Sequence, residues 1–282
     1  MRKSLIYLIL TFVFVAVFAL YMIVIQGGVD TRPPEIFFDG TMLELSAKAA
    51  DEAYMQGVSA TDDKDGDVTS SLVVESIKLL DSDGTIRITY AAFDAAGNVR
   101  KALRTARYTD YESPRFFLNR SLTFAYYSGF DIFNMVRAED ALDGNISHRV
   151  RITSMDDSSI ANVGAHQVQL RVTNSLGETV QLVVPVEVYD PEWYLASVKL
   201  DTYLLYLKKG DVFNPREHLD KFVVRGADTD VSRGIPEGID CEIDGAVNTA
   251  VPGVYRVQYT LTKDLNLTSY AGQAYLMVVV QE

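Results

Sequence analysis

The acidic side chains of one short stretch are the first candidates for chemistry in this sequence. The stretch reads SATDDKDGDVTSS, residues 59–71, and carries four aspartates around one glycine. Carboxylates in this arrangement could coordinate Ca²⁺, could act as an acid–base pair, or could cap the backbone of a turn. The four side chains concerned are Asp62, Asp63, Asp65 and Asp67.

A calcium loop of the EF-hand type makes a specific demand on spacing. It needs oxygen ligands at positions 1, 3 and 5, a glycine at position 6 and a glutamate at position 12. With Gly66 at position 6, position 12 is Leu72, and the second copy of the stretch, AEDALDGNIS at 138–147, places Val150 there. The closing carboxylate is absent from both copies, which favours an Asx-type turn with a left-handed glycine. A calcium site formed by Asp62, Asp63, Asp65 and Asp67 stays open for the first copy only.

Other catalytic patterns are missing from the chain. Acid–base catalysis needs carboxylates in a shared cleft, whereas these aspartates lie in polar, loop-like sequence. The three histidines have no neighbouring histidine or cysteine at metal-ligand spacing, and no G-x-S-x-G, S-x-x-K or Walker loop occurs. The sequence therefore predicts a protein that is not an enzyme, with no catalytic or cofactor-binding residue.

Composition narrows the class of protein further. The 282 residues are 48% apolar, enough for well-packed cores, and the single cysteine, Cys241, excludes an intrachain disulfide. The net charge of −12 comes without any basic stripe, which argues against a nucleic-acid partner because nothing would neutralise phosphates.

The acidic stretch belongs to an internal repeat of about 80 residues. Residues 60–69 align without a gap to 138–147, and GTIRITYAAFDAAGNV at 84–99 aligns with GAHQVQLRVTNSLGET at 164–179. In a third, diverged copy a glycine at 253 is followed by Asn266, where the other copies have their second glycine. In that copy ADTDVS at 227–232 keeps two aspartates of the acidic stretch and lacks its glycine. The turn markers of the repeat are Asp65, Gly66, Gly97, Asp143, Gly144, Gly177 and Asn266.

The segments between these turns alternate apolar and polar residues with a period of two. In the third copy Tyr255, Val257, Tyr259 and Leu261 would face one side of a strand and the polar residues between them the other. This pattern predicts half-buried antiparallel strands joined in hairpins. About seven short strands in each copy of about 80 residues predict an immunoglobulin-like sandwich, and hence an all-β chain of three tandem sandwiches.

The repeat also resembles a known family. The motif D-x-x-D-G-D-V-T in 62–69, followed after a strand by GTIRITYAAFDAAGN at 84–98, is similar to the bacterial Ig-like domains that occur in tandem on surface proteins and on one insecticidal crystal protein. YLKKGDVFNP at 206–215 resembles an opening strand of the same family. The resemblance implies a β-sandwich, a location in the bacterial envelope, and a spacer or adhesive role without catalysis.

A different kind of sequence precedes the repeats. Residues 5–25 contain no charge and no proline, and as a helix they would span about 31 Å, one hydrocarbon core. Arg2 and Lys3 come just before this run, which predicts a cytoplasmic N-terminus and a single membrane crossing. The expected domains are a cytoplasmic tail 1–4, a membrane anchor 5–26, and Ig-like domains 32–110, 111–190 and 191–282.

These observations favour one function and leave two alternatives open. The favoured function is a membrane-anchored, extracytoplasmic and non-catalytic protein of the bacterial envelope, which presents Ig-like domains to a surface polymer or a protein partner. The diverged third domain would be its binding end, because spacers can stay alike while a binding face must differ. The alternatives are an accessory subunit of a membrane-embedded envelope-assembly or secretion complex, and a calcium-stiffened adhesin.

Overall fold

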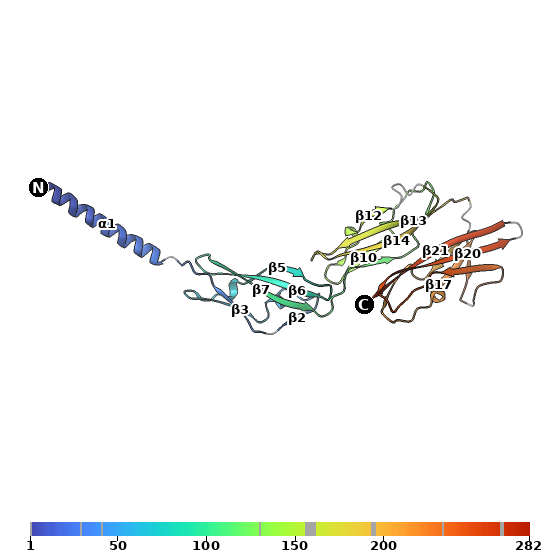
Figure 1. Ribbon diagram of the computed structural model, residues 1–282, viewed down its shortest axis with the longest axis horizontal. Helices are drawn as coiled ribbons and strands as arrows, with labels where there is room; N and C mark the ends of the chain where they lie inside the picture. Colours follow the sequence, from blue (N-terminus) through green and yellow to red (C-terminus); the bar gives the residue numbers. More distant parts are fainter. Residues whose placement is uncertain are drawn as a thin grey trace. The chain divides into compact units, whose positions relative to one another are not determined.

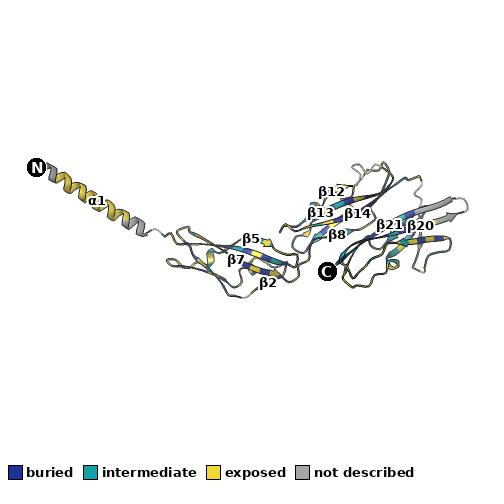
Figure 2. Ribbon diagram, viewed as in Figure 1, coloured by how far each residue is buried: buried dark blue, intermediate teal, exposed yellow. Residues whose placement is uncertain are grey.

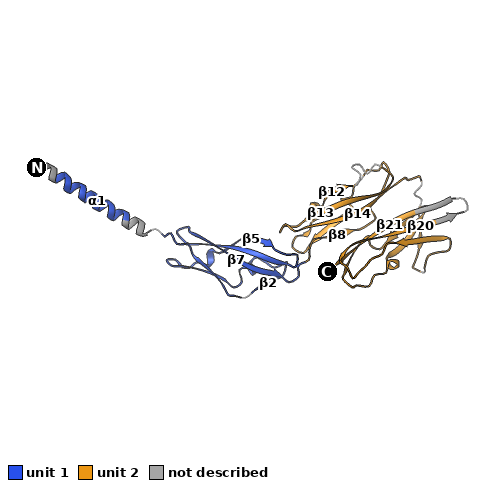
Figure 3. Cartoon of the chain, in the orientation of Figure 1, with its two compact units in different colours: residues 1–111 blue, residues 112–282 orange. Residues whose placement is uncertain are grey.

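The structure is a computed structural model in which one N-terminal helix precedes a series of β-sheets (Figure 1). It describes residues 2–28, 30–40, 42–129, 131–155, 162–192, 196–232, 234–265 and 268–282. Two compact units divide the chain, residues 1–111 and residues 112–282 (Figure 3). Each unit is described below by itself.

Unit 1 begins with the helix α1 (Arg2–Gly28). Leu, Ile, Phe and Val make up most of its uncharged run 5–25, and the described side chains from Ile6 to Met22 are exposed all round (Figure 2). The helix expected over the apolar run is therefore present. Among the described residues, no helix reaches both the length and the apolar character of a membrane span, so the transmembrane crossing stays a prediction.

The rest of unit 1 forms a sandwich of two sheets, sandwich 1. One sheet has the order β1 (Glu35–Phe38), β3 (Val58–Asp62) and β4 (Gly66–Asp67). The other has the order β2 (Leu43–Leu45), β7 (Val99–Tyr108), β6 (Thr85–Phe93) and β5 (Val73–Leu79). Two 3₁₀ turns, η1 (Asp51–Met55) and η2 (Thr69–Ser71), lie between strands.

Unit 2 contains two further sandwiches. In sandwich 2 the three-stranded sheet has the order β8 (Arg115–Leu118), β10 (Val136–Asp140) and β11 (Gly144–Asn145). Its four-stranded sheet has the order β9 (Thr123–Ala125), β14 (Thr179–Tyr189), β13 (Gly164–Thr173) and β12 (Arg151–Met155). In sandwich 3 the three-stranded sheet has the order β15 (Ala196–Leu200), β17 (Leu219–Val224) and β18 (Ala227–Asp230). Its four-stranded sheet has the order β16 (Leu204–Lys208), β21 (Thr268–Gln281), β20 (Gly253–Leu265) and β19 (Ile239–Asp244). The 3₁₀ turns η3 (Ser147–Arg149) and η4 (Pro215–His218) complete the unit.

All three sandwiches share one topology. Each joins a three-stranded sheet to a four-stranded sheet, and in each the second strand crosses over to pair in parallel with the last, as β2 does with β7, β9 with β14 and β16 with β21. The other pairings within the sheets are antiparallel. The prediction of three tandem β-sandwiches of about seven strands is thus confirmed within the described residues.

The period-two pattern of the sequence corresponds to burial in the strands. Along β13 the side chains of His166, Val168, Leu170 and Val172 are buried, and those of Ala165, Gln167 and Arg171 are not. The largest fully buried side chains are aromatic and branched, among them Tyr90 in sandwich 1, Phe116 in sandwich 2 and Phe222 in sandwich 3. Packing of the two inner faces therefore supplies each core without a disulfide.

Sandwiches 2 and 3 form one unit because their contacts continue across the junction. One cluster of buried apolar residues runs through both. Polar contacts add to it: the backbone N–H of Phe116 donates to the Tyr206 hydroxyl at 3.0 Å, and Arg115 donates to Oε1 of Gln281 at 2.7 Å. The Arg115 guanidinium also lies over the Tyr206 ring, 5.2 Å from its centroid. A cation over an aromatic ring is itself an attractive contact.

Candidate functional site

The acidic stretch forms a tight turn between β3 and β4. Oδ1 of Asp62 accepts hydrogen bonds from the backbone N–H of Lys64, at 2.8 Å, and of Asp65, at 3.0 Å. Gly66 follows with φ of 74°, a left-handed conformation in which a side chain is disfavoured. These are the contacts of an Asx-type turn, in which a carboxylate replaces a missing backbone acceptor.

The other three aspartates of the stretch point to different partners. Asp63 pairs with Arg32 at 2.9 Å, and Oδ2 of Asp65 accepts from the backbone N–H of Ala95 at 2.8 Å. Asp67 accepts from the backbone N–H of Thr69 at 2.9 Å, and the hydrogen bonds from Thr69 lower the pKa of Asp67. The four residues considered as a calcium set are therefore not brought together at one point.

Sandwich 2 repeats this turn with the same contacts. Oδ1 of Asp140 accepts from the backbone N–H of Leu142 and Asp143, at 2.9 and 3.0 Å, and Gly144 has φ of 66°. Asp143 accepts from the backbone N–H of Ser175, at 2.7 Å, and from Arg149. Partial burial raises the pKa of Asp143, but the hydrogen bonds from Ser175 and Arg149 outweigh it and leave this pKa below its usual range.

The second glycine marker of each copy lies in the hairpin between the two longest strands. Gly97 and Gly177 have φ of 86° and 88°, and each donates its N–H back to the residue three positions earlier, Asp94 or Asn174. The corresponding marker of the third copy, Asn266, lies outside the described residues.

Sandwich 3 replaces the acidic turn with a basic one. Its strands β17 and β18 are joined by Arg225 and Gly226, with φ of 52° and 78°. The stretch ADTDVS itself has no glycine, and the left-handed glycine of this turn is Gly226, one residue before it, in a shorter turn. Asp230 accepts from the backbone N–H of Ser232 at 2.8 Å, as Asp67 does from Thr69.

Sequence reasoning missed an acidic cluster in unit 1. Carboxylate oxygens of Asp30, Asp62 and Asp94 lie within 4.8 Å of one another. Asp30 precedes β1, Asp62 ends β3 and Asp94 follows β6, so three distant stretches of chain meet there. The sequence signal that could have indicated this cluster is in the repeat, whose alignment places the acid Asp94 opposite the amide Asn174.

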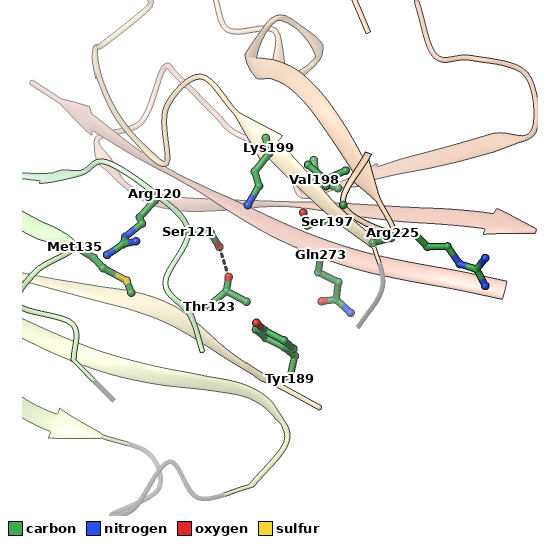
Figure 4. A pocket seen from close by; sticks show the side chains of 13 residues that line it. Arg120, Ser121, Thr123, Met135, Tyr189, Ser197, Val198, Lys199, Arg225 and Gln273 are labelled. Carbon is green, nitrogen blue, oxygen red and sulfur yellow. Dashed lines mark hydrogen bonds between the residues drawn. The ribbon is translucent and has the colours of Figure 1, made fainter. Parts of the chain in front are cut away.

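Unit 2 contains a cleft where sandwiches 2 and 3 meet, with a volume of about 600 Å³ (Figure 4). Its lining residues are Arg120, Ser121, Thr123, Met135 and Tyr189 from sandwich 2, and Ala196, Ser197, Val198, Lys199, Val223, Arg225, Gly226 and Gln273 from sandwich 3. Neither sandwich forms the cleft alone, because Arg120 and Tyr189 come from one and Lys199 and Gln273 from the other.

The chemistry of this cleft is basic and polar. Arg120, Lys199 and Arg225 are its charged lining residues, and no carboxylate, imidazole or thiol occurs among the lining residues that the structure describes. Ser121 and Thr123 share a hydrogen bond of 2.5 Å, and Tyr189 lies on the paired strand of the same sheet, whereas Gln273 belongs to sandwich 3 (Figure 4). Such a lining can hold an anion or a polar polymer, and it contains no acid–base pair.

An exposed aromatic turn borders the cleft. The backbone N–H of Tyr126 donates to the carbonyl of Tyr189, which lines the cleft, at 2.7 Å. The next residue, Tyr127, is 89% exposed and has φ of 68°, unusual for a residue with a side chain. In the surrounding stretch FAYYSGFDIF at 124–133, Tyr127 and Phe133 are the exposed ones among the described aromatic residues.

Comparison with known proteins identifies no family for this chain. No model of a known protein family matches it. Over 57 residues it is 47% identical to an uncharacterized 81.3 kDa protein of Acholeplasma phage L2, a match that covers 20% of this chain and 8% of the phage protein. The chain thus matches a small part of a much longer relative.

Several solved structures match this chain, all at low similarity. The M60 catalytic domain with the CBM51-1 and CBM51-2 domains of Clostridium perfringens ZmpB is 13% identical, with 90% of this chain and 43% of that chain covered and a TM-score of 0.27. The Protocadherin GammaB4 extracellular domain is 11% identical, with 89% and 51% covered and a TM-score of 0.22. Drosophila N-cadherin EC1-4 is 11% identical, with 90% and 68% covered and a TM-score of 0.22.

Proposed function

We propose that this chain is a non-catalytic binding and spacer protein of the extracytoplasmic face, and that the cleft of unit 2 binds an anionic polymer. The lining carries this proposal: its charged residues are Arg120, Lys199 and Arg225, and no carboxylate occurs among the described lining residues, in a chain of net charge −12. The Arg225 side chain extends away from the other two (Figure 4). On a surface that is otherwise acidic, such a cleft attracts a polyanion locally while the rest of the chain repels it.

In this proposal sandwiches 2 and 3 both contribute side chains that contact the ligand. Arg120 would hold one anionic group from sandwich 2, and Lys199 another from sandwich 3. Tyr189 offers a ring face for a sugar or another flat group. Both sandwiches are therefore needed, which modifies the expectation that the third domain alone is the binding end. Sandwich 1 would act as a spacer.

The test is a binding measurement on the full chain with defined polyanions. Polygalacturonate supplies carboxylates, polyphosphate supplies phosphates, and dextran supplies a neutral polymer of similar length. We expect binding to one or both polyanions, no binding to dextran, and weaker binding as salt rises, because exposed charge pairs are screened. Comparison of the two polyanions identifies the anionic group that the cleft prefers.

Matched double variants locate the interaction. Arg120→Gln with Lys199→Gln should weaken binding about tenfold, since two exposed charge contacts contribute roughly 1–2 kcal/mol together. The control variant, Lys208→Gln with Lys209→Gln, removes the same amount of charge at the end of β16. There β16 pairs with β21 near Gln281, which lies eight residues along β21 from the cleft residue Gln273. This control should leave binding almost unchanged. Equal losses in both double variants, or binding to dextran, would sink the proposal.

The membrane location is part of the same proposal. It rests on the uncharged run 5–25, on Arg2 and Lys3 before it, and on the exposed apolar side chains of α1 from Ile6 to Met22. A helix that is apolar on all sides requires an apolar surrounding such as lipid. After expression in a bacterial host, the chain should stay in the membrane pellet through an alkaline carbonate wash. In a separate experiment on intact membranes, protease added from the extracytoplasmic side should digest residues 30–282. Release by carbonate contradicts the anchor.

A further inference from the structure

We propose that unit 1 binds a divalent cation, Ca²⁺ by preference, on Asp30, Asp62 and Asp94. Carboxylate oxygens of the three residues lie within 4.8 Å of one another. Each is nearly withdrawn from solvent: Asp62 is 9% exposed, Asp94 is 8% exposed, and the Asp30 side chain is 9% exposed. Carboxylates this close and this buried repel one another unless a cation lies among them.

The hydrogen bonds of Asp62 leave one of its oxygens for such a cation. Oδ1 accepts from the backbone N–H groups of Lys64 and Asp65. Oδ2 is buried and accepts no hydrogen bond from any described residue. A buried carboxylate oxygen without a donor is costly, and a metal ion is a strong partner for it.

The two other carboxylates are held in place by neighbouring donors. Both oxygens of Asp94 accept from Asn98, Oδ1 from its backbone N–H and Oδ2 from its side-chain amide, each at 2.7 Å. Oδ1 of Asp30 accepts from the backbone N–H of Arg32 at 3.0 Å. The Asn98 amide also donates to the carbonyls of Asp30 and Arg32, which ties the leading segment to the hairpin. Oriented carboxylates of this kind are typical of metal ligands.

Sandwich 2 provides an internal comparison at the same place in the fold. There Asp140 corresponds to Asp62, and Asn174 stands where sandwich 1 has Asp94. The Asn174 amide donates to Oδ2 of Asp140 at 3.1 Å, so this buried oxygen has a proton donor. In sandwich 1 the amide is replaced by a carboxylate, which has no proton to offer at neutral pH. A cation can supply the positive charge that the Asn174 amide supplies in sandwich 2.

Charge balance points to a divalent ion. Lys64 lies 3.8 Å from Asp30 and offsets one of the three negative charges. Two negative charges then remain for the ion to neutralise. Among divalent ions that prefer oxygen ligands, Ca²⁺ accepts irregular coordination and completes its shell with water or carbonyl oxygens, whereas Mg²⁺ requires a near-octahedral set. Three carboxylates from two turns and a leading segment suit Ca²⁺ better.

The site is accessible and its position gives it a structural role. A cavity of about 320 Å³, lined in part by Arg32, Thr61 and Asp62, opens beside it. Through the three carboxylates the ion would fasten the segment before β1 to the β3–β4 turn and to the β6–β7 hairpin. This set shares only Asp62 with the four aspartates that the sequence suggested. The inference is independent of the anionic ligand proposed for unit 2.

The test is a titration of the full chain with metal alone. Protein in detergent micelles, freed of metal with a chelator and dialysed, is titrated with CaCl₂ and with MgCl₂ by calorimetry. We expect one Ca²⁺ per chain with a Kd of about 10⁻⁴ to 10⁻³ M, as in extracellular calcium modules, and Mg²⁺ binding at least about tenfold weaker. Calcium should also raise the unfolding midpoint of unit 1, because it binds only the folded state.

Two substitutions separate this site from the rest of the acidic turn. Asp94→Asn installs the amide of sandwich 2, so it should abolish the calcium shift and raise the midpoint measured without calcium. A merely structural role for Asp94 would give a lower midpoint instead. Asp63→Asn, in the same turn but paired with Arg32, should leave calcium binding intact. No heat and no midpoint shift with wild-type protein, or equal losses in both variants, would overturn the proposal, and Mg²⁺ binding as tight as Ca²⁺ would overturn the preference.

Discussion

Asn174 donates a hydrogen bond from Nδ2 to Oδ2 of Asp140 across 3.1 Å, in a place where both residues are buried. The contact joins the β13–β14 hairpin to the β10–β11 turn. At the equivalent place in sandwich 1, Asp62 and Asp94 bring two carboxylates together. The two copies share their fold and differ here in one residue. The Asn174 amide gives the buried carboxylate of sandwich 2 a hydrogen-bond donor, whereas Asp94 in sandwich 1 adds a second carboxylate.

The first prediction reverses this difference. Asn174→Asp should destabilise unit 2 at neutral pH by about 1–3 kcal/mol, because Asp140 then loses its donor and faces a second buried charge. Mutual repulsion raises the pKa of the new carboxyl pair above its value in the unfolded chain. The deficit relative to wild type should therefore be largest near pH 7, should shrink as the pH falls through the raised pKa, and should be smallest below about pH 4. Urea unfolding of both proteins at several pH values measures it, and a deficit independent of pH would contradict the explanation.

A second prediction concerns the junction of sandwiches 2 and 3. Tyr206→Phe removes the acceptor of the Phe116 N–H, and Phe116 is fully buried. The cost should be roughly 1–2 kcal/mol, the usual penalty for an orphaned buried donor. Scanning calorimetry should show a lower midpoint for unit 2 and no change for unit 1. Tyr255→Phe is the matched control, since its hydroxyl donates to the carbonyl of Val251 at an exposed position, and it should shift little.

A third prediction follows from Glu187, which lies at the same junction. Burial raises the pKa of Glu187, and the hydrogen bond from the Tyr275 hydroxyl, at 3.4 Å, and the nearby His166 offset this only in part. A carboxyl whose pKa is raised by folding favours the folded state when protonated and loses that contribution as the pH rises through the raised pKa. Glu187→Gln should therefore be more stable than wild type at pH 7. The gain should vanish below about pH 4, where the wild-type carboxyl is protonated in both states.

A fourth prediction concerns the single thiol. Cys241 is 6% exposed on β19, and burial raises its pKa to about 11. The thiolate is the reactive form, so the burial of Cys241 and its raised pKa both protect it from reaction. At pH 8 a maleimide should label the native chain at least about 100-fold more slowly than the chain unfolded in urea. Rapid labelling of native protein, or a covalent dimer under oxidising conditions, would show that Cys241 is accessible.

Much of the fold was predictable because local signals and tertiary structure agree. The alternation around Val168 and Leu170 predicted a strand with one buried face, and the glycines at 97 and 177 predicted the ends of hairpins. The alanines in the segment 44–54 favour a helix by intrinsic propensity. There Leu43–Leu45 form β2 and Asp51–Met55 a short 3₁₀ turn, since Leu43 and Leu45 fill the core beside β7. Tertiary packing outweighs intrinsic propensity in such a segment.

The candidate sites were much less predictable. Spacing along the chain grouped Asp62 with Asp63, Asp65 and Asp67, yet neighbours in a turn project in different directions and meet different donors. The cluster instead draws on Asp30 and Asp94, which lie 32 residues to either side of Asp62. The cleft combines Arg120 with Lys199 and Arg225, and no local pattern connects these residues.

The sequence by itself determined the number of repeats, their β character and the positions of their turns. These properties depend on local conformational preference and on the periodicity of burial, both of which are visible along the chain. Only the tertiary structure decided which charged groups meet. Charges interact through space, and the pairing of strands sets the distance between Asp62 and Asp94 or between the walls of the cleft. A single residue at a shared position, Asp94 or Asn174, then determines whether a buried carboxylate meets a hydrogen-bond donor or another carboxylate.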